Sequence, residues 1–319
     1  MTPLRERRRA DAAARRRRLR RRRILAVAAL AAGVAGGVAV ASAGSHHART
    51  HGQAARIRIA PTVDVRPVRR VPRRLVALRP SAASRTATVP ILMYHVLAPP
   101  PPGAPFPGLY VPAPEFAAQM RALARAGFHA VTLDQVRRAW LGLAGLPPSP
   151  IVLSFDNGYR TQYTVARPVL RRLHWVGDEN LQLSGLPPSQ GGLSAREVKA
   201  LLAAGWELDT QGYSHADLPA LDAASLAQQV DLGVRLIERR FGVRPHWFCY
   251  PSGRYDATVI AAVRAAGFVG ATTVIPGWAD RTDDPYRLPR LRVLGGTSPA
   301  ALLELIRGSR GAPDPPPAY

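Results

Sequence analysis

The chain has 319 residues, of which 47% are hydrophobic, so it can form one core of roughly two hundred residues alongside further segments. Its formal net charge is +23, yet residues 86–319 hold 22 basic and 18 acidic side chains, so most of the excess precedes them. A nucleic-acid-binding domain is expected to carry a basic face on its folded part. We therefore expect no nucleic acid partner. The single cysteine, Cys249, excludes an intramolecular disulfide and is expected to be a small buried hydrophobe.

The N-terminal segment has the charge pattern of an exported protein. Residues 1–23 hold twelve arginines against two acidic residues, and residues 24–43 are twenty uncharged residues. That length suffices for a helix to span a bilayer, and the arginines favour a cytoplasmic position for the basic head. The sequence Ala41-Ser42-Ala43 also fits a signal-peptide cleavage site. Either interpretation predicts a domain outside the cell, held at the membrane by a single helix or secreted.

Two further segments have the composition of solvated chain. Residues 44–87 are rich in Arg, Pro and small residues, which predicts a linker. Its positive charge could lie on anionic lipid or on an acidic wall polymer, and a plain charged tether is the simpler alternative. Residues 309–319 are Pro-rich and predict a disordered tail. The folded domain is therefore expected at 88–308.

Within that domain, apolar runs alternate with segments of helical period. The spacing predicts helices near 114–126, 133–143, 164–173, 194–204, 223–241, 256–266 and 299–306, and a Pro-rich loop at 99–107. Ser194 and Glu197 form a capping box, and Gly205 and Gly242 are stop signals. Strands are expected at 89–95, 130–133, 151–156, 206–210, 246–250, 269–273 and 288–293. This alternation predicts an α/β fold built from βα units.

Polar residues follow several of the predicted strands. Asp156 ends one such strand, His95 follows another, and the segment 209–217 holds further polar side chains. One aspartate after a strand is more often a cap than a catalyst, and a lone histidine is more often structural than a ligand. In a parallel α/β barrel, however, the carboxyl ends of all strands open at one mouth. We therefore expect these groups to converge.

Five segments together resemble the polysaccharide deacetylase family, also called NodB homology or carbohydrate esterase family 4-like. The segments are Pro-Ile-Leu-Met-Tyr-His ending at His95, Leu-Ser-Phe-Asp-Asn-Gly-Tyr ending at Tyr159, Gly-Trp-Glu-Leu starting at Gly205, Tyr-Pro-Ser-Gly-Arg-Tyr starting at Tyr250, and Asp-Pro-Tyr-Arg-Leu-Pro-Arg ending at Arg290. The resemblance covers about residues 88–307. It implies a distorted (β/α) barrel of about seven parallel strands. It also implies metal-assisted removal of acetyl groups from a polysaccharide such as peptidoglycan.

The resemblance also implies roles for individual residues. Asp156 falls on the position of the catalytic base. The three positions that hold a divalent metal, zinc or a similar ion, fall on Asn157, Gln211 and His215. Only His215 is a typical ligand, because Asn and Gln offer a neutral oxygen in place of a carboxylate and an imidazole. The sequence therefore predicts an altered metal site that binds metal weakly.

Other residues are candidates for completing this site. Asp209 shares a strand face with Gln211 by period two, so it is a speculative replacement carboxylate. The family's late Leu-x-His acid is absent, and His95 is the candidate to replace it, with a structural role as the alternative. An arginine that some family members use falls on Cys249. The backbone oxyanion donor falls on Ser252, beside Gly253 and Tyr250.

Aromatic residues near these segments are candidates for a sugar-stacking wall, with a place in the core as the alternative. They are Tyr94, Tyr159, Tyr213, Tyr250, Tyr255 and Trp278.

Two functions remain open from the sequence. The first is a hydrolase that removes acetyl groups from a cell-envelope glycan with Asp156 as base and an altered metal site. The second is a non-catalytic glycan-binding or wall-scaffolding protein that has lost the metal, since a fold does not fix a function. A third hypothesis, a nucleic-acid or membrane-surface protein built around the arginine tracts, predicts salt-dependent binding.

Overall fold

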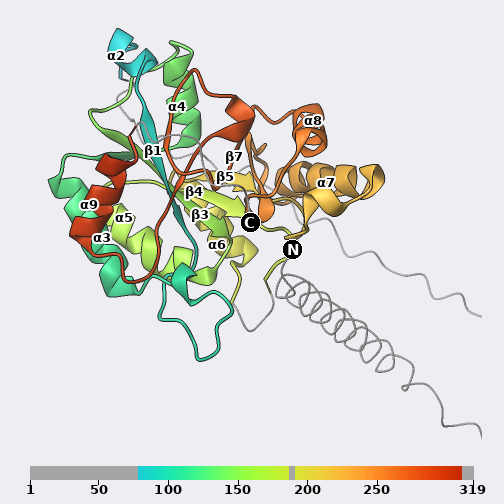
Figure 1. Cartoon of the computed structure of the whole chain (residues 1–319), viewed down its shortest axis with the longest axis horizontal. Coiled ribbons are helices and arrows are strands. Elements are labelled where there is room, and N and C mark those ends of the chain that lie inside the picture. The colour runs from blue at the N-terminus through green and yellow to red at the C-terminus, as the bar shows by residue number, and fades with distance from the viewer. Residues whose placement is uncertain (1–77, 187–190, 311–319) are drawn as a thin grey trace, which may run out of the picture. The chain divides into compact units, whose positions relative to one another are not determined.

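The computed structural model describes residues 78–186 and 191–310. These residues form a curled mixed sheet with helices packed around it (Figure 1). The sheet runs in the order β7-β6-β5-β4-β3-β1-β8, and β2 pairs with β3 and β9 with β1. The strands are β1 (Val89–Tyr94), β2 (His129–Val131), β3 (Pro150–Asn157), β4 (Asp178–Leu181), β5 (Glu207–Thr210), β6 (Trp247–Cys249), β7 (Gly270–Thr272), β8 (Trp278–Ala279) and β9 (Leu291–Arg292).

One irregular segment brings the two ends of the parallel sheet together. Leu288 bridges Thr272 at the end of β7 in parallel, and β9, which follows it in the chain, pairs in parallel with β1. The pairs from β1 through β3, β4, β5, β6 and β7 are also parallel. The predicted distorted barrel of about seven parallel strands is confirmed. Its one antiparallel addition is β8, which pairs with β1 at the start of that strand.

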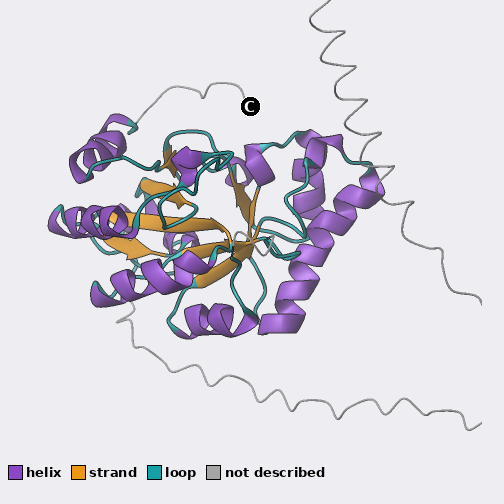
Figure 2. Cartoon of the chain, turned by 90° about the horizontal axis from the view of Figure 1, so that it is seen from below, coloured by secondary structure: helices purple, strands orange, loops and turns teal. Residues whose placement is uncertain are grey.

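Helices surround the strands, as Figure 2 shows. They are α2 (Ala82–Arg85), α3 (Ala113–Arg125), α4 (Leu133–Trp140), α5 (Arg167–Arg172), α6 (Ala195–Ala203), α7 (Ala223–Phe241), α8 (Ala257–Ala265) and α9 (Pro299–Gly308). The main core lies between the outward side chains of β1 and β3 and the inward faces of α3, α5 and α9. It includes a ring cluster in which Phe155 stacks on Tyr94 and on Trp206.

Local sequence signals set the ends of several helices. The side chain of Ser194 accepts a hydrogen bond from the Glu197 N–H, and the Glu197 carboxylate accepts one from the Ser194 N–H, as the capping box predicts. Asp222 caps the start of α7, and Gly242 ends it in the left-handed region at φ +70°. Helix positions and stops were therefore readable from the sequence alone.

Several features of the fold differ from the sequence expectations, and β8 (Trp278–Ala279) is one strand that was not predicted. The strand β4 was not predicted, because its sequence Asp-Glu-Asn-Leu lacks an apolar run although all four residues are buried. The predicted strand at 288–293 shortens to β9, after a 3₁₀ turn at Pro285–Arg287. Residues 78–87, assigned to the linker, belong to the domain: α2 lies within them and the Leu78 carbonyl accepts a hydrogen bond from the Gly145 N–H at 2.7 Å.

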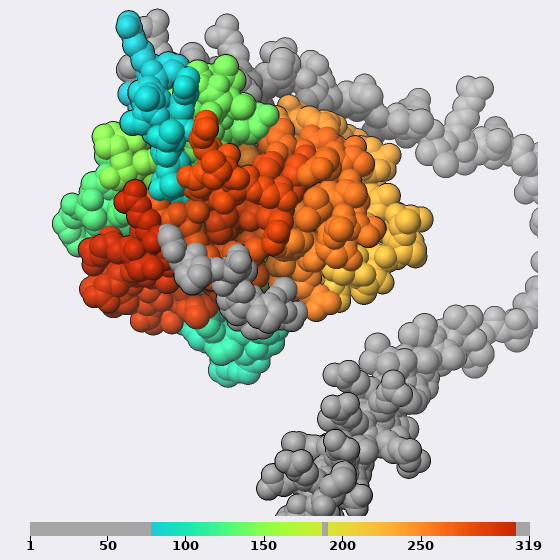
Figure 3. All heavy atoms as spheres, turned by 45° about the horizontal axis from the view of Figure 1, so that its top comes forward, coloured from blue at the N-terminus to red at the C-terminus, as the bar shows by residue number. Residues whose placement is uncertain are grey.

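Figure 3 shows the blue residues that open the described domain on its surface beside the green residues near α4. The basic head, the apolar segment 24–43, most of the linker and the tail from 311 lie outside the described residues. Among the described residues, no helix combines the length and the apolar character needed to cross a bilayer.

Candidate functional site

The candidate site lies at the carboxyl ends of β1 and β3, where the chain places His95 and Asp156. Side chains alternate along β3, so Leu153 and Phe155 enter the helix-covered core while Ser154 and Asp156 face the barrel interior. Gln162 fixes the two strand ends relative to each other: its amide donates to the Asp156 carbonyl at 2.8 Å and to the His95 carbonyl at 3.1 Å. Gln162 begins a short π-helical turn, a feature often found at functional sites.

Asp156 is fully engaged by neighbouring donors. Both of its carboxylate oxygens accept a hydrogen bond from the Arg290 guanidinium, at 2.8 and 2.9 Å, and one also accepts from the Asn180 amide at 2.9 Å. Burial by itself would raise the pKa of this carboxyl, but the charge of Arg290 prevails and lowers the pKa of Asp156 to about 2. The side chain is therefore a carboxylate throughout the neutral range.

Arg290 is the functional residue that sequence reasoning missed. It is only 1% exposed, and besides Asp156 its guanidinium donates to the Thr273 carbonyl and the Ser154 hydroxyl. It also lies 3.2 Å from the Cys249 sulfur. The signal was present, because Arg290 ends the Leu-Pro-Arg run that carries part of the family resemblance. Nothing in that run indicates that the side chain reaches a residue 134 positions earlier.

His95 lies beside the same carboxylate. Its Nε2 is 3.9 Å from Asp156 Oδ2, and its Nδ1 is buried without a hydrogen-bond partner within the described part of the chain. Burial lowers the pKa of His95 to about 4, with the charge of Asp156 acting in the opposite direction. The imidazole is thus neutral near pH 7, and it can accept a proton next to a carboxylate that would stabilise the resulting cation.

The three positions assigned to metal ligands lie close to this pair. Asn157 follows Asp156 directly, with its backbone in the left-handed region at φ +76°. The Gln211 amide contacts the sulfur of Cys249 at 3.4 Å, and that sulfur is 3.6 Å from Asp156. Burial lowers the pKa of His215, and the charge of Asp156 acts against that shift. Gln211 and His215 thus lie near Asp156, whereas for Asn157 the structure gives its place in the chain and its backbone conformation.

This set of donors does not fit a zinc-type ion. It consists of one imidazole and two amides, and both oxygens of the nearest carboxylate are already held by Arg290. Gln211 Oε1 is buried and has no hydrogen-bond partner among the residues that the structure describes, so it could supply one neutral oxygen. No group of three His, Cys, Asp or Glu side chains in the described ranges is arranged to hold a metal. The chemistry of this chain therefore has to be derived from its own side chains.

Asp209 does not supply the missing carboxylate, which corrects the sequence expectation. Its Oδ1 accepts hydrogen bonds from the backbone N–H groups of His246 and Trp247, at 3.1 and 2.9 Å, at the start of β6. Burial and the charge of Asp178 raise its pKa well above the usual range. Period two predicts a shared face for Asp209 and Gln211, but it could not show that the Asp209 carboxylate contacts the backbone at β6.

Cys249 is fully buried, as expected, and burial raises the pKa of its thiol to about 12. The side chain is thus an uncharged neighbour of Asp156 and Arg290 at the position where some family members have an arginine. Arg290, from another segment, provides a positive charge beside Asp156.

The predicted oxyanion segment forms a tight turn after β6. Ser252 is exposed, with φ +54°, a strained value for a residue with a side chain. Gly253 has φ +68°, and an added Cβ there would lie 2.3 Å from a methyl carbon of Val274. Tyr250 is not available to a ligand, because it is 1% exposed and its hydroxyl donates to the Tyr286 carbonyl at 3.0 Å.

Some of the other aromatic candidates lie at the mouth of the barrel and some lie in its hydrophobic core. Tyr159 lies at the mouth, near Asp156 and Tyr110, and burial raises its pKa. Tyr213 is 37% exposed. Tyr94 is a core residue whose hydroxyl donates to Gln119 at 2.9 Å, and Tyr255 stacks on Tyr250. Trp278, in β8, lies at the opposite end of β1 from His95.

Comparisons with known proteins agree with this architecture. Residues 144–271 match the family model described as polysaccharide deacetylase. The chain is 26% identical over 219 residues, which is 68% of this chain and 75% of the relative, to the Bacillus subtilis (strain 168) protein YxkH, whose name assigns it to the polysaccharide deacetylases. A shorter match, 39% over 49 residues, covers 15% of this chain and 7% of the poly-beta-1,6-N-acetyl-D-glucosamine N-deacetylase of Escherichia coli (strain K12).

A solved structure has the same fold. The Streptococcus pyogenes deacetylase PplD, determined in complex with acetate, superposes with a TM-score of 0.64 at 23% identity, over 69% of this chain and 99% of that one. Identity at this level supports the fold alone. The resemblance drawn from the sequence is confirmed by the family model, and the superposition confirms the fold.

Proposed function

We propose that this chain, a member of the polysaccharide deacetylase family, removes acetyl groups from a glycan of the cell envelope by means of Asp156 and His95. The observation that carries the proposal is the placement of His95 Nε2 3.9 Å from the carboxylate of Asp156 at the barrel mouth. The matches to a polysaccharide deacetylase and to an N-deacetylase of an acetylated glucosamine polymer support the substrate class.

The two residues have different tasks in this mechanism. The sequence resemblance assigns the base to Asp156, but Arg290 holds both of its oxygens and its pKa is about 2, so it is a weak base. His95 is neutral at neutral pH and therefore takes the proton as water attacks the acetyl carbonyl. Asp156 stabilises the imidazolium that forms. His95 then returns the proton to the sugar nitrogen as the carbon–nitrogen bond breaks, and acetate and the free amine leave.

The turn that contains Ser252 is proposed to face the oxygen of the tetrahedral intermediate through a backbone N–H, which a side-chain change does not remove. Gly253 permits the close approach of that turn to Val274. Tyr159 and Tyr213, at or near the mouth, are proposed to contact the sugar. With no strong Lewis acid in the residue set, we expect slow turnover compared with metal-dependent members of the family.

A second function is favoured by one specific observation. Asn157 and Gln211 stand at two ligand positions, which suits a protein that binds an envelope glycan without cleaving it. Both proposals retain export of the domain to the cell envelope, by an anchor or a cleaved signal within residues 24–43, and neither includes a nucleic acid partner.

Acetate release and metal content distinguish the two functions. The purified protein is incubated with an N-acetylglucosamine oligomer, with and without a chelator, and its bound metals are quantified. The hydrolase predicts acetate release that resists the chelator and is abolished in His95→Gln, with Arg121→Ala, at an exposed position on α3, as the control that should leave it unchanged. Binding of the oligomer without acetate release would contradict the hydrolase and support the binder. The double variant Asn157→Asp, Gln211→His is expected to gain stoichiometric zinc; failure to bind zinc would show that these positions are misassigned.

A further inference from the structure

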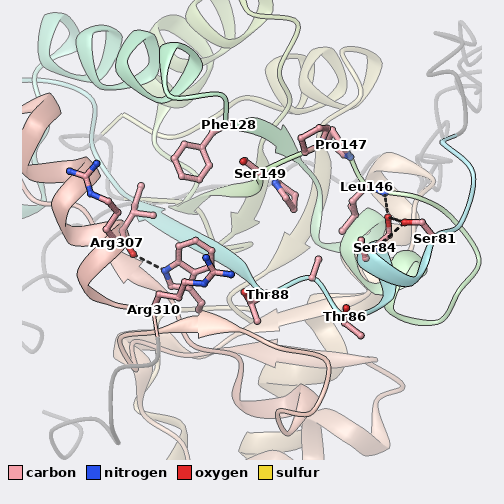
Figure 4. A pocket seen from close by; sticks show the side chains of 16 residues that line it. Ser81, Ser84, Thr86, Thr88, Phe128, Leu146, Pro147, Ser149, Arg307 and Arg310 are labelled. Atoms are coloured by element: carbon pink, nitrogen blue, oxygen red, sulfur yellow. Dashed lines mark hydrogen bonds between the residues drawn. The ribbon is translucent and has the colours of Figure 1, made fainter.

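We propose that a cavity at the opposite end of the barrel binds an anionic saccharide, meaning a sugar ring that carries a phosphate or carboxylate group. The cavity has a volume of about 820 Å³, within the range of small-molecule sites (Figure 4). Thr88, which precedes β1, and Pro150, which begins β3, are among its lining residues. Asp156 lies near the other end of β3, so this cavity is separate from the candidate active site.

The cavity is built before any ligand arrives. One wall joins α2 to the loop before β3: the Ser84 hydroxyl accepts a hydrogen bond from the Leu146 N–H at 3.0 Å and contacts the Ser81 hydroxyl at 2.8 Å. The same loop is held by His129, whose Nδ1 lies 2.9 Å from the Pro148 carbonyl. Three prolines within residues 147–150 restrict its backbone further. Binding would therefore need little ordering of the walls.

The charge of the cavity points to an anion. Arg307 and Arg310, both exposed, come from the end of α9, and the sixteen described residues that line the cavity include no Asp or Glu. Guanidinium groups suit phosphate and carboxylate because they donate two parallel hydrogen bonds.

The remaining lining residues suit a sugar ring. Phe128 and Trp278 provide aromatic surface, and the Trp278 ring is oriented by a hydrogen bond from its indole N–H to the Ile306 carbonyl at 2.8 Å. Arg310 lies over the same ring, with its guanidinium carbon 5.1 Å from the ring centre. Hydroxyl side chains, Thr88 and Ser149 among them, offer hydrogen-bonding groups for sugar hydroxyls. Aromatic, hydroxyl and guanidinium groups in one cavity match a charged saccharide better than a bare anion or a lipid tail.

The inference extends beyond the proposed function, because it gives the domain a second contact with the envelope. A cavity behind the barrel can hold an anionic polymer while the mouth receives a different glycan segment. Its occupancy does not depend on whether Asp156 and His95 catalyse a reaction.

Calorimetric titration of the full chain tests this site. The probes are N-acetylglucosamine 6-phosphate, uncharged N-acetylglucosamine and inorganic phosphate. We expect the sugar phosphate to bind most tightly and to lose at least tenfold in affinity in the double variant Arg307→Ala, Arg310→Ala. The matched control is Arg121→Ala, Arg125→Ala, which removes the same charge from exposed positions on α3 and should leave the affinity unchanged. Thr88→Val, nearly isosteric, should weaken the sugar phosphate but not inorganic phosphate.

Several results would overturn the proposal. These are equal affinity for inorganic phosphate and the sugar phosphate, an equal loss in both double variants, and no binding of any probe. Displacement of the sugar phosphate by vesicles that contain phosphatidylglycerol, with no matching effect from neutral vesicles, would assign the cavity to lipid headgroups instead. Acetate release from a small acetylated substrate is followed in parallel. It should be the same in the Arg307→Ala, Arg310→Ala variant as in the natural chain, so failure of this proposal is distinguishable from failure of the proposed function.

Discussion

Replacement of Arg290 by methionine should destabilise the domain strongly and change the direction of its pH dependence. The guanidinium is 1% exposed and donates to both oxygens of Asp156, so its removal leaves a buried carboxylate without its partner. Breaking a buried ion pair from one side costs about 3–5 kcal/mol. That is a large part of the roughly 5–15 kcal/mol that stabilises a typical domain.

The pH dependence follows from the pKa of Asp156. In the natural chain this pKa is lowered from 3.8 to about 2. At pH values above the unfolded pKa, this shift stabilises the folded state by about 2 kcal/mol. This contribution is lost as the pH falls from about 4 to about 2. Without Arg290, burial dominates and the pKa rises above its unfolded value. In the variant, stability from Asp156 should therefore be lost as the pH rises above about 4 toward the raised pKa, so the variant gains stability as the pH falls toward about 4 and no more below it.

Urea denaturation at a series of pH values measures both effects. The double variant Asp156→Asn, Arg290→Met should be more stable near pH 7 than Arg290→Met alone, because it no longer buries an unpaired charge. Arg244→Ala is the control, since Arg244 makes an exposed ion pair with Glu238 that should contribute about 0–1 kcal/mol. If Arg290→Met cost no more than Arg244→Ala, or if Asp156→Asn made it worse, the electrostatic account of this pair would be wrong.

Three further predictions concern other parts of the domain. Burial and the charge of Glu207 raise the pKa of Asp178, so the folded state keeps a proton that the unfolded chain releases. The free energy of unfolding therefore falls as the pH rises above about 4. In thermal melts, Asp178→Asn should be more stable than the natural chain at pH 8 and equal to it near pH 3. Because His95 must be neutral to accept a proton and its pKa is about 4, kcat/KM should rise with pH through about 4; a profile flat from pH 3 to 7 would exclude His95 as the base. Gly253→Ala should cost more than about 1 kcal/mol in urea denaturation, because φ is +68° and the new methyl would overlap Val274; unchanged stability would show that the turn can relax.

Much of the fold could be predicted because its signals are local. Alternating apolar runs and helical periods gave the βα order, and the hydrogen bonds of Ser194 and Glu197 match the predicted capping box. The strand β4 was missed for a related reason: its polar residues are buried by neighbours on both sides, and a single-segment pattern cannot show such neighbours.

The residues of the candidate site also differ in how far the sequence could predict their positions. Position after a strand together with the family resemblance nominated Asp156 and His95, and the structure places them 3.9 Å apart. Period two nominated Asp209 and the resemblance nominated Tyr250, and the polar groups of these two residues are held by the backbone at β6 and at Tyr286. Strand periodicity defines the face on which a side chain lies, but the direction of its polar group depends on partners elsewhere in the chain.

By itself, the sequence determined the alternation of strands and helices and the caps of its helices, because each is encoded in a short run of residues; the barrel was implied by the family resemblance. Only the tertiary structure decided that Arg290 holds Asp156, that Cys249 is an uncharged neighbour of that pair, and that a cavity opens at the start of β1 and β3. These features join segments more than thirty positions apart, and the geometry of such contacts is set by the closure of the barrel.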